Sequence, residues 1–470
     1  MQDDLPTSKP LFTRLRSSIF GSPGATSHVE DSDDSQSSFS NSSDSETELN
    51  ISEITATISP TNSNSNSNSN SNSNSNSNSN NDLSLLNITV SKPMLLGDSS
   101  IPTLPTITPT PKTKPFPTII NSSPNVKIDS FGFIIPPKPK KGFRPASCHT
   151  TAIRIPKKTV QQRSNLATKR VAKWVVMLKN WDSLSNTRLL KNRIRKGVPD
   201  SVRGRVWNII GGVGELRAKW GANYYQSLVE SKYVPDQDIR GTIERDINRT
   251  YPSHAMFAIS SGEEGGQGCL RRVLRAYSLH DEEVGYCQGM GFIVAMFLTY
   301  MEEESAFWQL VSVMGSDPCG IRNLYKIGMP LAQENFYVGA KLIKKFFPIL
   351  AKHMAKENLD ISMYATQWFM TIFTNSFPFS FVTLVWDIFL AEGWKIVFRC
   401  MLAIMKHSVP QLLRLDFEGL MHFMRDVPSK IDGPVMMERA LKIELKQSHI
   451  EYYKVKYKKM REAEEKAEEA

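Results

Sequence analysis

The sequence lacks the cysteine and histidine patterns that mark disulfide frameworks and metal sites. Five cysteines occur among 470 residues, and no two of them form a Cys-x-x-Cys pair. Their odd number and wide spacing argue against a disulfide-bonded secreted fold and favour a reducing compartment. The eight histidines are dispersed and include no His-Glu-x-x-His motif. We therefore expect no metal site. The cysteines are Cys148, Cys269, Cys287, Cys319 and Cys400.

Motifs of independent catalysis are also missing. No serine stands in a Gly-x-Ser-x-Gly elbow. The glycine-rich stretch 262–268 contains two glutamates and no Gly-Lys-Ser/Thr ending, so it predicts a flexible loop rather than a phosphate cradle. Cys287 has no local base and is expected to be a buried small residue. These absences favour binding or activation of a partner over catalysis by this chain alone, and no cofactor of its own is expected.

Long apolar runs are absent. The longest, 290–301, is too short to span a bilayer. A second candidate, 377–398, is interrupted by Asp387, Glu392 and Lys395. The first residues are acidic and lack an apolar core, so neither a secretory signal nor a transit peptide is evident. We expect a cytoplasmic protein without a transmembrane segment, which could lie peripherally on endomembranes.

Positive charge is present in excess but is unevenly distributed. The formal net charge is +10, yet residues 1–137 are mildly acidic. Segment 138–196 carries seventeen Lys and Arg against one acid, Asp182. Such a run could attract an anionic membrane or an acidic partner, or it could be a solvated linker. Nucleic acid is not expected, because no binding motif or interleaved aromatic residues accompany the charge.

Composition divides the chain into four parts. Residues 1–125 are rich in Ser, Asn and Pro and predict disorder. Residues 126–165 form a basic, proline-containing linker whose apolar island, 131–135, could dock onto a folded domain. Residues 166–434 show apolar residues at three- and four-residue spacing, with helices expected at 364–375, 381–390 and 395–406. Residues 435–470 predict a charged C-terminal helix. The fold class is therefore all-α.

One stretch, 243–250, combines an apolar face with an ion pair. Ile243 and Ile247 stand four apart and share a helical face. Asp246 and Arg249 stand three apart and can pair. The helix is expected to end before Pro252, so Arg249 lies near its end. An isolated pair of this kind is usually a surface salt bridge worth under about 1 kcal/mol.

Further motifs follow in a fixed order and change that interpretation. Together they resemble the TBC family, activators of Rab-type small GTPases, with a core match over 197–406. The resemblance implies an all-α domain of TBC type with two helical subdomains. The motifs are Arg195-Lys-Gly-Val-Pro199 with Arg203 and Trp207, Ile243-x-x-Asp246-x-x-Arg249-Thr250, Gly285-Tyr-Cys-Gln-Gly-Met290, residues 362–369, residues 385–390 and Glu392-Gly393.

The resemblance also implies roles for individual residues. Arg249 resembles an arginine finger and Gln288 a glutamine finger, both inserted in trans into a GTPase that brings its own GTP and Mg²⁺. Asp246 is expected to position Arg249 or to pair with Arg203, which itself could be a core ion pair or a GTPase contact. The other supporting residues are Tyr286, which could fix the direction of Gln288, Gly289, which leaves room for a partner's backbone, and Thr250.

Two functions remain open from the sequence. The first is a GTPase-activating protein for a Rab-type small GTPase, which would regulate vesicle trafficking. The second is a non-catalytic adaptor module that binds a GTPase or a membrane. A nucleic-acid-binding helical protein is a third and weaker alternative, because only the basic segment favours it.

Overall fold

The computed structural model describes residues 127–135, 160–184, 188–233, 237–258, 263–315 and 317–468. All of them belong to one compact unit, Ile107–Ala470. The predicted disordered region 1–125 and most of the basic linker, including 136–159, lie outside the described residues. The all-α prediction is confirmed, since the described part of the chain contains a single pair of two-residue strands besides its helices.

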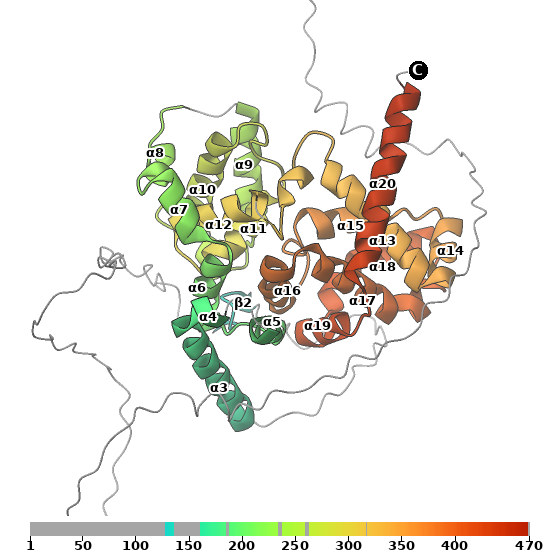
Figure 1. Ribbon diagram of the computed structural model, residues 1–470, viewed down its shortest axis with the longest axis horizontal. Helices are drawn as coiled ribbons and strands as arrows, with labels where there is room; N and C mark the ends of the chain where they lie inside the picture. Colours follow the sequence, from blue (N-terminus) through green and yellow to red (C-terminus); the bar gives the residue numbers. More distant parts are fainter. Residues whose placement is uncertain are drawn as a thin grey trace, which may run out of the picture. The chain divides into compact units, whose positions relative to one another are not determined.

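The first half of the domain is a group of helices around the apolar helix α11 (Figure 1). All nine residues of α11 are buried, and it packs against α9, α10 and α12. The apolar run predicted too short for a membrane is therefore the centre of this core. The elements are α3 (Val160–Lys179), α4 (Trp181–Leu184), α5 (Arg188–Arg195), α6 (Asp200–Ile210), α7 (Val213–Trp220), α8 (Tyr224–Val229), α9 (Gln237–Arg249), η1 (Ala255–Phe257), α10 (Gly266–His280), α11 (Met290–Leu298) and α12 (Glu303–Gly315).

The second half is built around α16 and α17, whose residues are mostly buried. Helix α16 also packs on α5 and α6, and so joins the two groups, as Figure 1 shows. The elements are η3 (Ile321–Leu324), α13 (Pro330–Phe346), α14 (Pro348–Lys356), α15 (Ile361–Met370), α16 (Phe379–Glu392), α17 (Trp394–Leu412), α18 (Phe417–Asp426), η4 (Val427–Lys430), α19 (Gly433–Leu441) and α20 (Gln447–Glu468).

Two expected helices differ in the structure. The helix expected over 364–375 ends at Met370, because Ile372 and Phe373 adopt positive φ angles of 46° and 67°, which no α-helix contains. The helix expected over 435–470 is two helices. Asp432 caps α19 by accepting from the backbone N–H of Val435 at 3.1 Å. Helix α19 packs on α16 and α17, and α20 packs on α13.

The apolar island packs onto the helical domain as a small hairpin. Strands β1 (Lys127–Ile128) and β2 (Ile134–Ile135) pair antiparallel. The Asp129 carboxylate closes the turn by accepting from the backbone N–H groups of Phe131 and Phe133, each at 2.9 Å. Both phenylalanine rings contact Phe379, at 5.6 and 5.4 Å between centroids. This contact joins the hairpin to the start of α16.

Candidate functional site

Helix α9 delivers Arg249 to the surface as its last residue. Ile243 and Ile247 are buried, as their spacing predicted, and hold the helix against the core. Beyond the helix, Tyr251 adopts a positive φ of 44°, and its hydroxyl donates to the carbonyl of Thr374 at 2.9 Å. The chain therefore turns sharply away, and the Arg249 side chain is left 39% exposed.

One buried carboxylate connects Arg249 with the loop that carries Gln288. Asp246 is 2% exposed. Its Oδ1 accepts from Nε of Arg249 at 2.7 Å and from Nη2 at 2.6 Å. Its Oδ2 accepts from the backbone N–H of Gly289 at 2.8 Å and from the Tyr286 hydroxyl. Asp246 thus pairs with Arg249, one of the two partners that the sequence allowed.

Glycines at both ends of the Gln288 loop allow its close packing. Gly285 and Gly289 have φ angles of 55° and 105°, which favour glycine. A Cβ on Gly289 would lie 3.2 Å from Cγ2 of Thr371. Gln288 itself is exposed, and its carboxamide forms no hydrogen bond with any described residue. The loop is held by its neighbours, so the carboxamide is available to a partner.

Tyr286 and Cys287 stay neutral in this setting. Burial, together with the adjacent Asp246 carboxylate, raises the pKa of the Tyr286 hydroxyl well above its usual value. The hydroxyl therefore remains a proton donor to Asp246. Burial raises the pKa of the Cys287 thiol to about 11. Cys287 is half-buried rather than fully buried, and its protonated thiol is a poor nucleophile.

Phe292 and Thr250 complete the surroundings of Arg249. The Arg249 guanidinium lies 5.5 Å from the centroid of the Phe292 ring, within the range of a cation–π contact. Thr250 is buried, and its hydroxyl donates to the backbone carbonyl of Asp246 at 2.6 Å. Thr250 therefore ties down the end of α9. Phe292 was missed by the sequence reasoning, because nothing distinguishes it within the apolar run of α11.

Arg203 lies outside this site. It is 4% exposed and donates from Nε to Oδ1 of Asp387 at 3.1 Å, so it does not pair with Asp246. Asp387 also accepts from the indole N–H of Trp207 and from the backbone N–H of Val198, both at 2.8 Å. Of the two roles left open for Arg203, the structure shows the core ion pair, which fastens α6 to α16.

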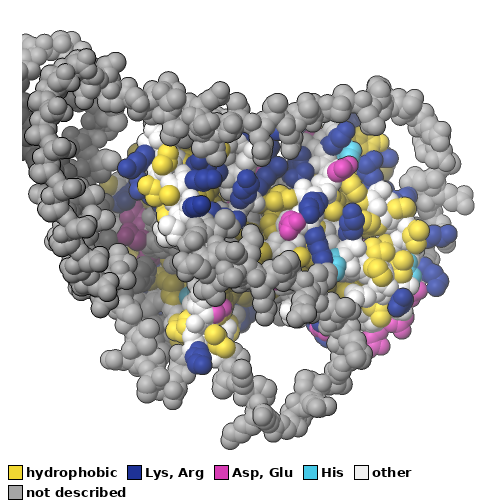
Figure 2. Space-filling model, turned by 90° about the horizontal axis from the view of Figure 1, so that it is seen from below, with side chains coloured by type: hydrophobic (Ala, Val, Ile, Leu, Met, Phe, Trp, Pro, Cys, Tyr) yellow, Lys and Arg dark blue, Asp and Glu magenta, His cyan; other side chains and the backbone are white. Residues whose placement is uncertain are grey.

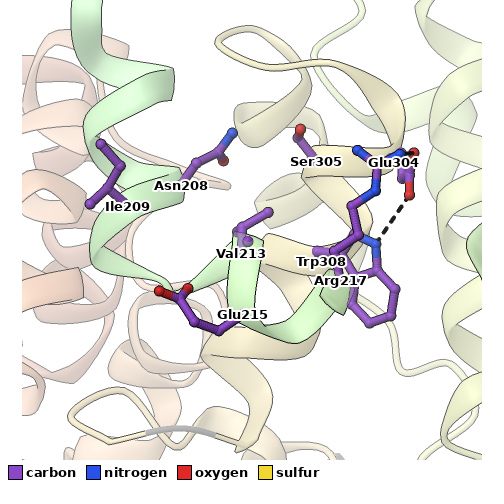
Figure 3. A pocket seen from close by; sticks show the side chains of 9 residues that line it. Asn208, Ile209, Val213, Glu215, Arg217, Glu304, Ser305 and Trp308 are labelled. Carbon is purple, nitrogen blue, oxygen red and sulfur yellow. Dashed lines mark hydrogen bonds and ion pairs between the residues drawn. The ribbon is translucent and has the colours of Figure 1, made fainter. Parts of the chain in front are cut away.

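A pocket of about 340 Å³ lies between α6, α7 and the start of α12 (Figure 3). Glu304 binds Arg217 at 2.9 Å and the Trp308 indole N–H at 3.4 Å along its wall. None of the candidate residues lines it. Across the residues that the structure describes, no cluster of His, Cys, Asp and Glu could hold a metal ion. Nor is any described helix both long and apolar enough to cross a bilayer.

Comparison with known proteins places this arrangement in a family. The Rab-GTPase-TBC domain profile matches residues 200–413. The crystal structure of the Chlamydomonas flagellar RabGAP TBC domain is 30% identical with a TM-score of 0.51, covering 67% of this chain and 100% of that one. The chain belongs to the TBC family. Its TBC domain contains the Asp246, Arg249 and Gln288 arrangement described above.

Two further relatives of this TBC domain come from animals, and a further solved structure shares its fold. "Rab GTPase-activating protein tbc-11" of Caenorhabditis elegans is 35% identical over 303 residues, covering 62% of this chain and 31% of the relative. "TBC1 domain family member 10A" of Mus musculus is 35% identical over 285 residues, covering 60% of this chain and 52% of the relative. The Ypt/Rab-GAP domain of Gyp1p, 20% identical with a TM-score of 0.51 over 62% of this chain and 99% of that one, shares the fold. The chain therefore spans about a third to a half of these two animal relatives.

Proposed function

We propose that this protein accelerates GTP hydrolysis by a Rab-type small GTPase, with Arg249 and Gln288 inserted in trans. The observation that carries the proposal is the shared Asp246 carboxylate, which holds Arg249 on one oxygen and the Gln288 loop on the other. The Arg249 side chain and the backbone of the Gln288 loop, which would serve the same phosphoryl group, are thereby bound to one carboxylate. Relatives named as Rab GTPase-activating proteins support the choice of partner.

Arg249 would stabilise the charge that develops on the γ-phosphoryl group. Its Nε and Nη2 are engaged by Asp246, whereas Nη1 has no hydrogen-bond partner among the described residues. One edge of the guanidinium is therefore fixed and the rest can meet a phosphate. Fixing the side chain in advance reduces the entropy lost on binding. An arginine finger contributes about 10³–10⁵ in rate.

Gln288 would orient the attacking water. A carboxamide can accept a hydrogen bond from the water through its oxygen and donate through its nitrogen. Gln288 is exposed on a loop whose backbone is held at Gly289 by Asp246. The exposed carboxamide can thus enter a partner's nucleotide site while its backbone stays in place. GTP and Mg²⁺ would come with the GTPase.

The protein would accordingly regulate vesicle trafficking from the cytoplasm or from the surface of endomembranes. The basic segment 138–196 could support contact with an anionic membrane. A non-catalytic adaptor that binds the GTPase without accelerating hydrolysis is the alternative. The exposed Arg249 and Gln288 side chains favour the activator, because an adaptor needs neither.

Single-turnover GTP hydrolysis by a panel of Rab-type GTPases tests the proposal with the full chain. We expect acceleration of at least one GTPase, and a loss of about 100-fold or more for Arg249→Lys, since lysine keeps the charge but not the planar fork. Gln288→Ala should cause a comparable loss. Arg245→Lys, an exposed position on the same helix, is the matched control and should leave the rate unchanged. Binding without acceleration by the wild type would favour the adaptor.

A further inference from the structure

The hairpin of β1 and β2 packs on the chain just beyond the end of α9. The backbone carbonyl of Gly132 accepts from the N–H of Ala255 at 2.9 Å, and the N–H of Ile134 donates to the carbonyl of Ser253 at 2.8 Å. Ser253 stands four residues after Arg249. Two backbone hydrogen bonds from the hairpin therefore hold the segment through which the chain leaves Arg249.

Gly132 fits the hairpin closely against His254. Its φ of 95° favours glycine, and a Cβ there would lie 2.5 Å from Nε2 of His254. The same Nε2 donates to the backbone carbonyl of Phe131 at 2.8 Å. The Phe133 ring packs edge-on against the imidazole, with 4.8 Å between the ring centroids. A side chain at position 132 would therefore push the hairpin away from His254.

Phe133 also supports Tyr251, whose backbone conformation is unusual. Tyr251 has a φ of 44°, and residues with a side chain keep such a conformation only where the surrounding structure holds them there. The Tyr251 hydroxyl donates to the carbonyl of Thr374 at 2.9 Å. Its ring lies edge-on to Phe133 and Phe379, each at 5.7 Å between centroids. Phe133 is thus the part of this support that the hairpin provides.

The contacts of Tyr251 continue to the Arg249 side chain. The Tyr251 ring meets Phe292 edge-on, at 5.8 Å between centroids. The Arg249 guanidinium lies 5.5 Å from the centroid of the same Phe292 ring. Contacts therefore lead from Phe133 through Tyr251 and Phe292 to Arg249, although Phe133 stands 116 residues earlier in the chain (249 − 133).

We propose that Phe133 is a positioning residue for Arg249. The docked hairpin holds Tyr251 in its left-handed conformation, and Tyr251 with Phe292 directs the guanidinium toward the partner's phosphoryl group. The inference rests on the proposed function, because it gives Phe133 a part in the same reaction. Loss of the Phe133 ring leaves the Asp246 hydrogen bonds to Arg249 in place but widens the range of guanidinium positions. Misplacement of a group that acts in the transition state lowers the maximal rate and leaves partner binding unchanged.

Membrane attachment is a separate effect that the experiment must exclude. Figure 2 shows many Lys and Arg side chains and few Asp and Glu among the described residues on one face of the domain. Such a face attracts anionic membranes. Hydrolysis is therefore measured in solution without vesicles, so that a change in rate cannot come from altered attachment to a membrane.

Single-turnover GTP hydrolysis at increasing concentrations of the full chain separates the maximal rate from the half-saturating concentration. With a GTPase that the wild type accelerates, Phe133→Ala should lower the maximal rate at least about tenfold at an unchanged half-saturating concentration. Phe133→Tyr keeps the ring and should keep the rate. Ile135→Ala removes a 48% exposed apolar side chain from the same hairpin and is the matched control. Gly132→Ala detaches the hairpin without removing an apolar side chain, and should act as Phe133→Ala does.

Hydrogen exchange of the free protein gives a readout that needs no GTPase. The N–H of His254 donates to the carbonyl of Tyr251 at 2.9 Å, and that of Ala255 donates to Gly132. Both amides should exchange at least about tenfold faster in Phe133→Ala, while the amides of α17 exchange as in the wild type. Exchange confined in this way marks a local change rather than a loss of overall stability.

The two measurements separate failure of this inference from failure of the proposed function. A maximal rate unchanged in Phe133→Ala, a change in the half-saturating concentration alone, or unchanged exchange at His254 and Ala255 would each overturn the positioning role. Absence of acceleration by the wild type would refute the proposed function, and the exchange rates would still decide whether Phe133 holds the segment after Arg249. Thermal melts establish that each variant is folded.

Discussion

The backbone N–H of Gly289 donates to Oδ2 of Asp246 at 2.8 Å, which links residues 43 positions apart in the chain. The other oxygen of the same carboxylate holds Arg249. A displacement of the Asp246 carboxylate would therefore disturb the hydrogen bonds of both Arg249 and the Gln288 loop. Substitutions can therefore distinguish the role of the Asp246 hydrogen bonds from the roles of Arg249 and Gln288.

Replacement of Asp246 should damage both stability and activity. Asp246→Ala leaves the Tyr286 hydroxyl and the Gly289 N–H without their acceptor, and unsatisfied buried groups cost about 1–3 kcal/mol each. We expect the free energy of unfolding to fall by about 2–4 kcal/mol. The acceleration of GTP hydrolysis should fall at least about tenfold. Urea denaturation and single-turnover hydrolysis measure the two effects, and Glu282→Ala at an exposed position is the control. Full activity in a folded Asp246→Ala protein would show that Asp246 does not position Arg249 and Gln288.

Substitution of Gly289 tests the backbone geometry of the loop. Gly289→Ala places a Cβ at a φ of 105° and 3.2 Å from Cγ2 of Thr371. We expect a loss of about 1–3 kcal/mol, from the strained backbone and from the contact. Thr371→Ser removes Cγ2, so the double variant Gly289→Ala/Thr371→Ser should regain the stability lost through the close contact. It should keep the loss of stability that comes from the strained backbone. A complete recovery, measured by urea denaturation, would mean that backbone strain contributes nothing.

The buried ion pair between Arg203 and Asp387 should determine stability rather than hydrolysis. Arg203→Ala leaves the Asp387 carboxylate buried without its cation, which costs about 3–5 kcal/mol. We expect a large fall in the urea midpoint. Any folded fraction should retain the hydrolysis rate per folded molecule. A selective loss of rate with unchanged stability would instead place Arg203 at the GTPase contact.

His254 predicts a pH-dependent stability. Its Nε2 lies 2.8 Å from the carbonyl oxygen of Phe131 and donates to it, and its Nδ1 accepts from the backbone N–H of Met256 at 3.1 Å. Burial lowers the pKa of His254 below the usual 6.5. Below about pH 6.5 the unfolded chain binds a proton that the folded chain does not, so stability falls by up to about 1.4 kcal/mol per pH unit. This loss levels off below the folded pKa, and above about pH 7.5 His254 contributes no pH dependence.

Urea denaturation between about pH 5 and 8 measures this dependence. His280, His407 and His449 also have pKa values lowered by burial, and they act with the same sign. The difference between the wild type and His254→Asn therefore isolates His254, because Asn keeps an acceptor for the Met256 N–H but does not titrate. Parallel curves for the two proteins would contradict the prediction.

The sequence by itself determined the local elements of this protein. The spacing of Ile243 and Ile247 was sufficient to predict the buried face of α9, and Pro252 was sufficient to predict where the helix ends. Both effects act within a few residues of the chain. The apolar run 290–301 was expected only to be too short for a bilayer, and the structure places its first nine residues in the buried helix α11. The candidate residues came from the resemblance to the TBC family, which depends on the order of motifs along the chain and can therefore be recognised from the sequence.

Only the tertiary structure decided which partners these residues have. Asp387 meets Arg203 across 184 residues, Tyr286 meets Asp246 across 40, and Phe292 comes to lie beside Arg249. No periodicity records such contacts, because they depend on how whole helices pack. The early end of α15 likewise follows from the positive φ angles of Ile372 and Phe373. Side chains of these types favour helix or strand, so the sequence gives no sign of a positive φ, and the surrounding structure imposes it.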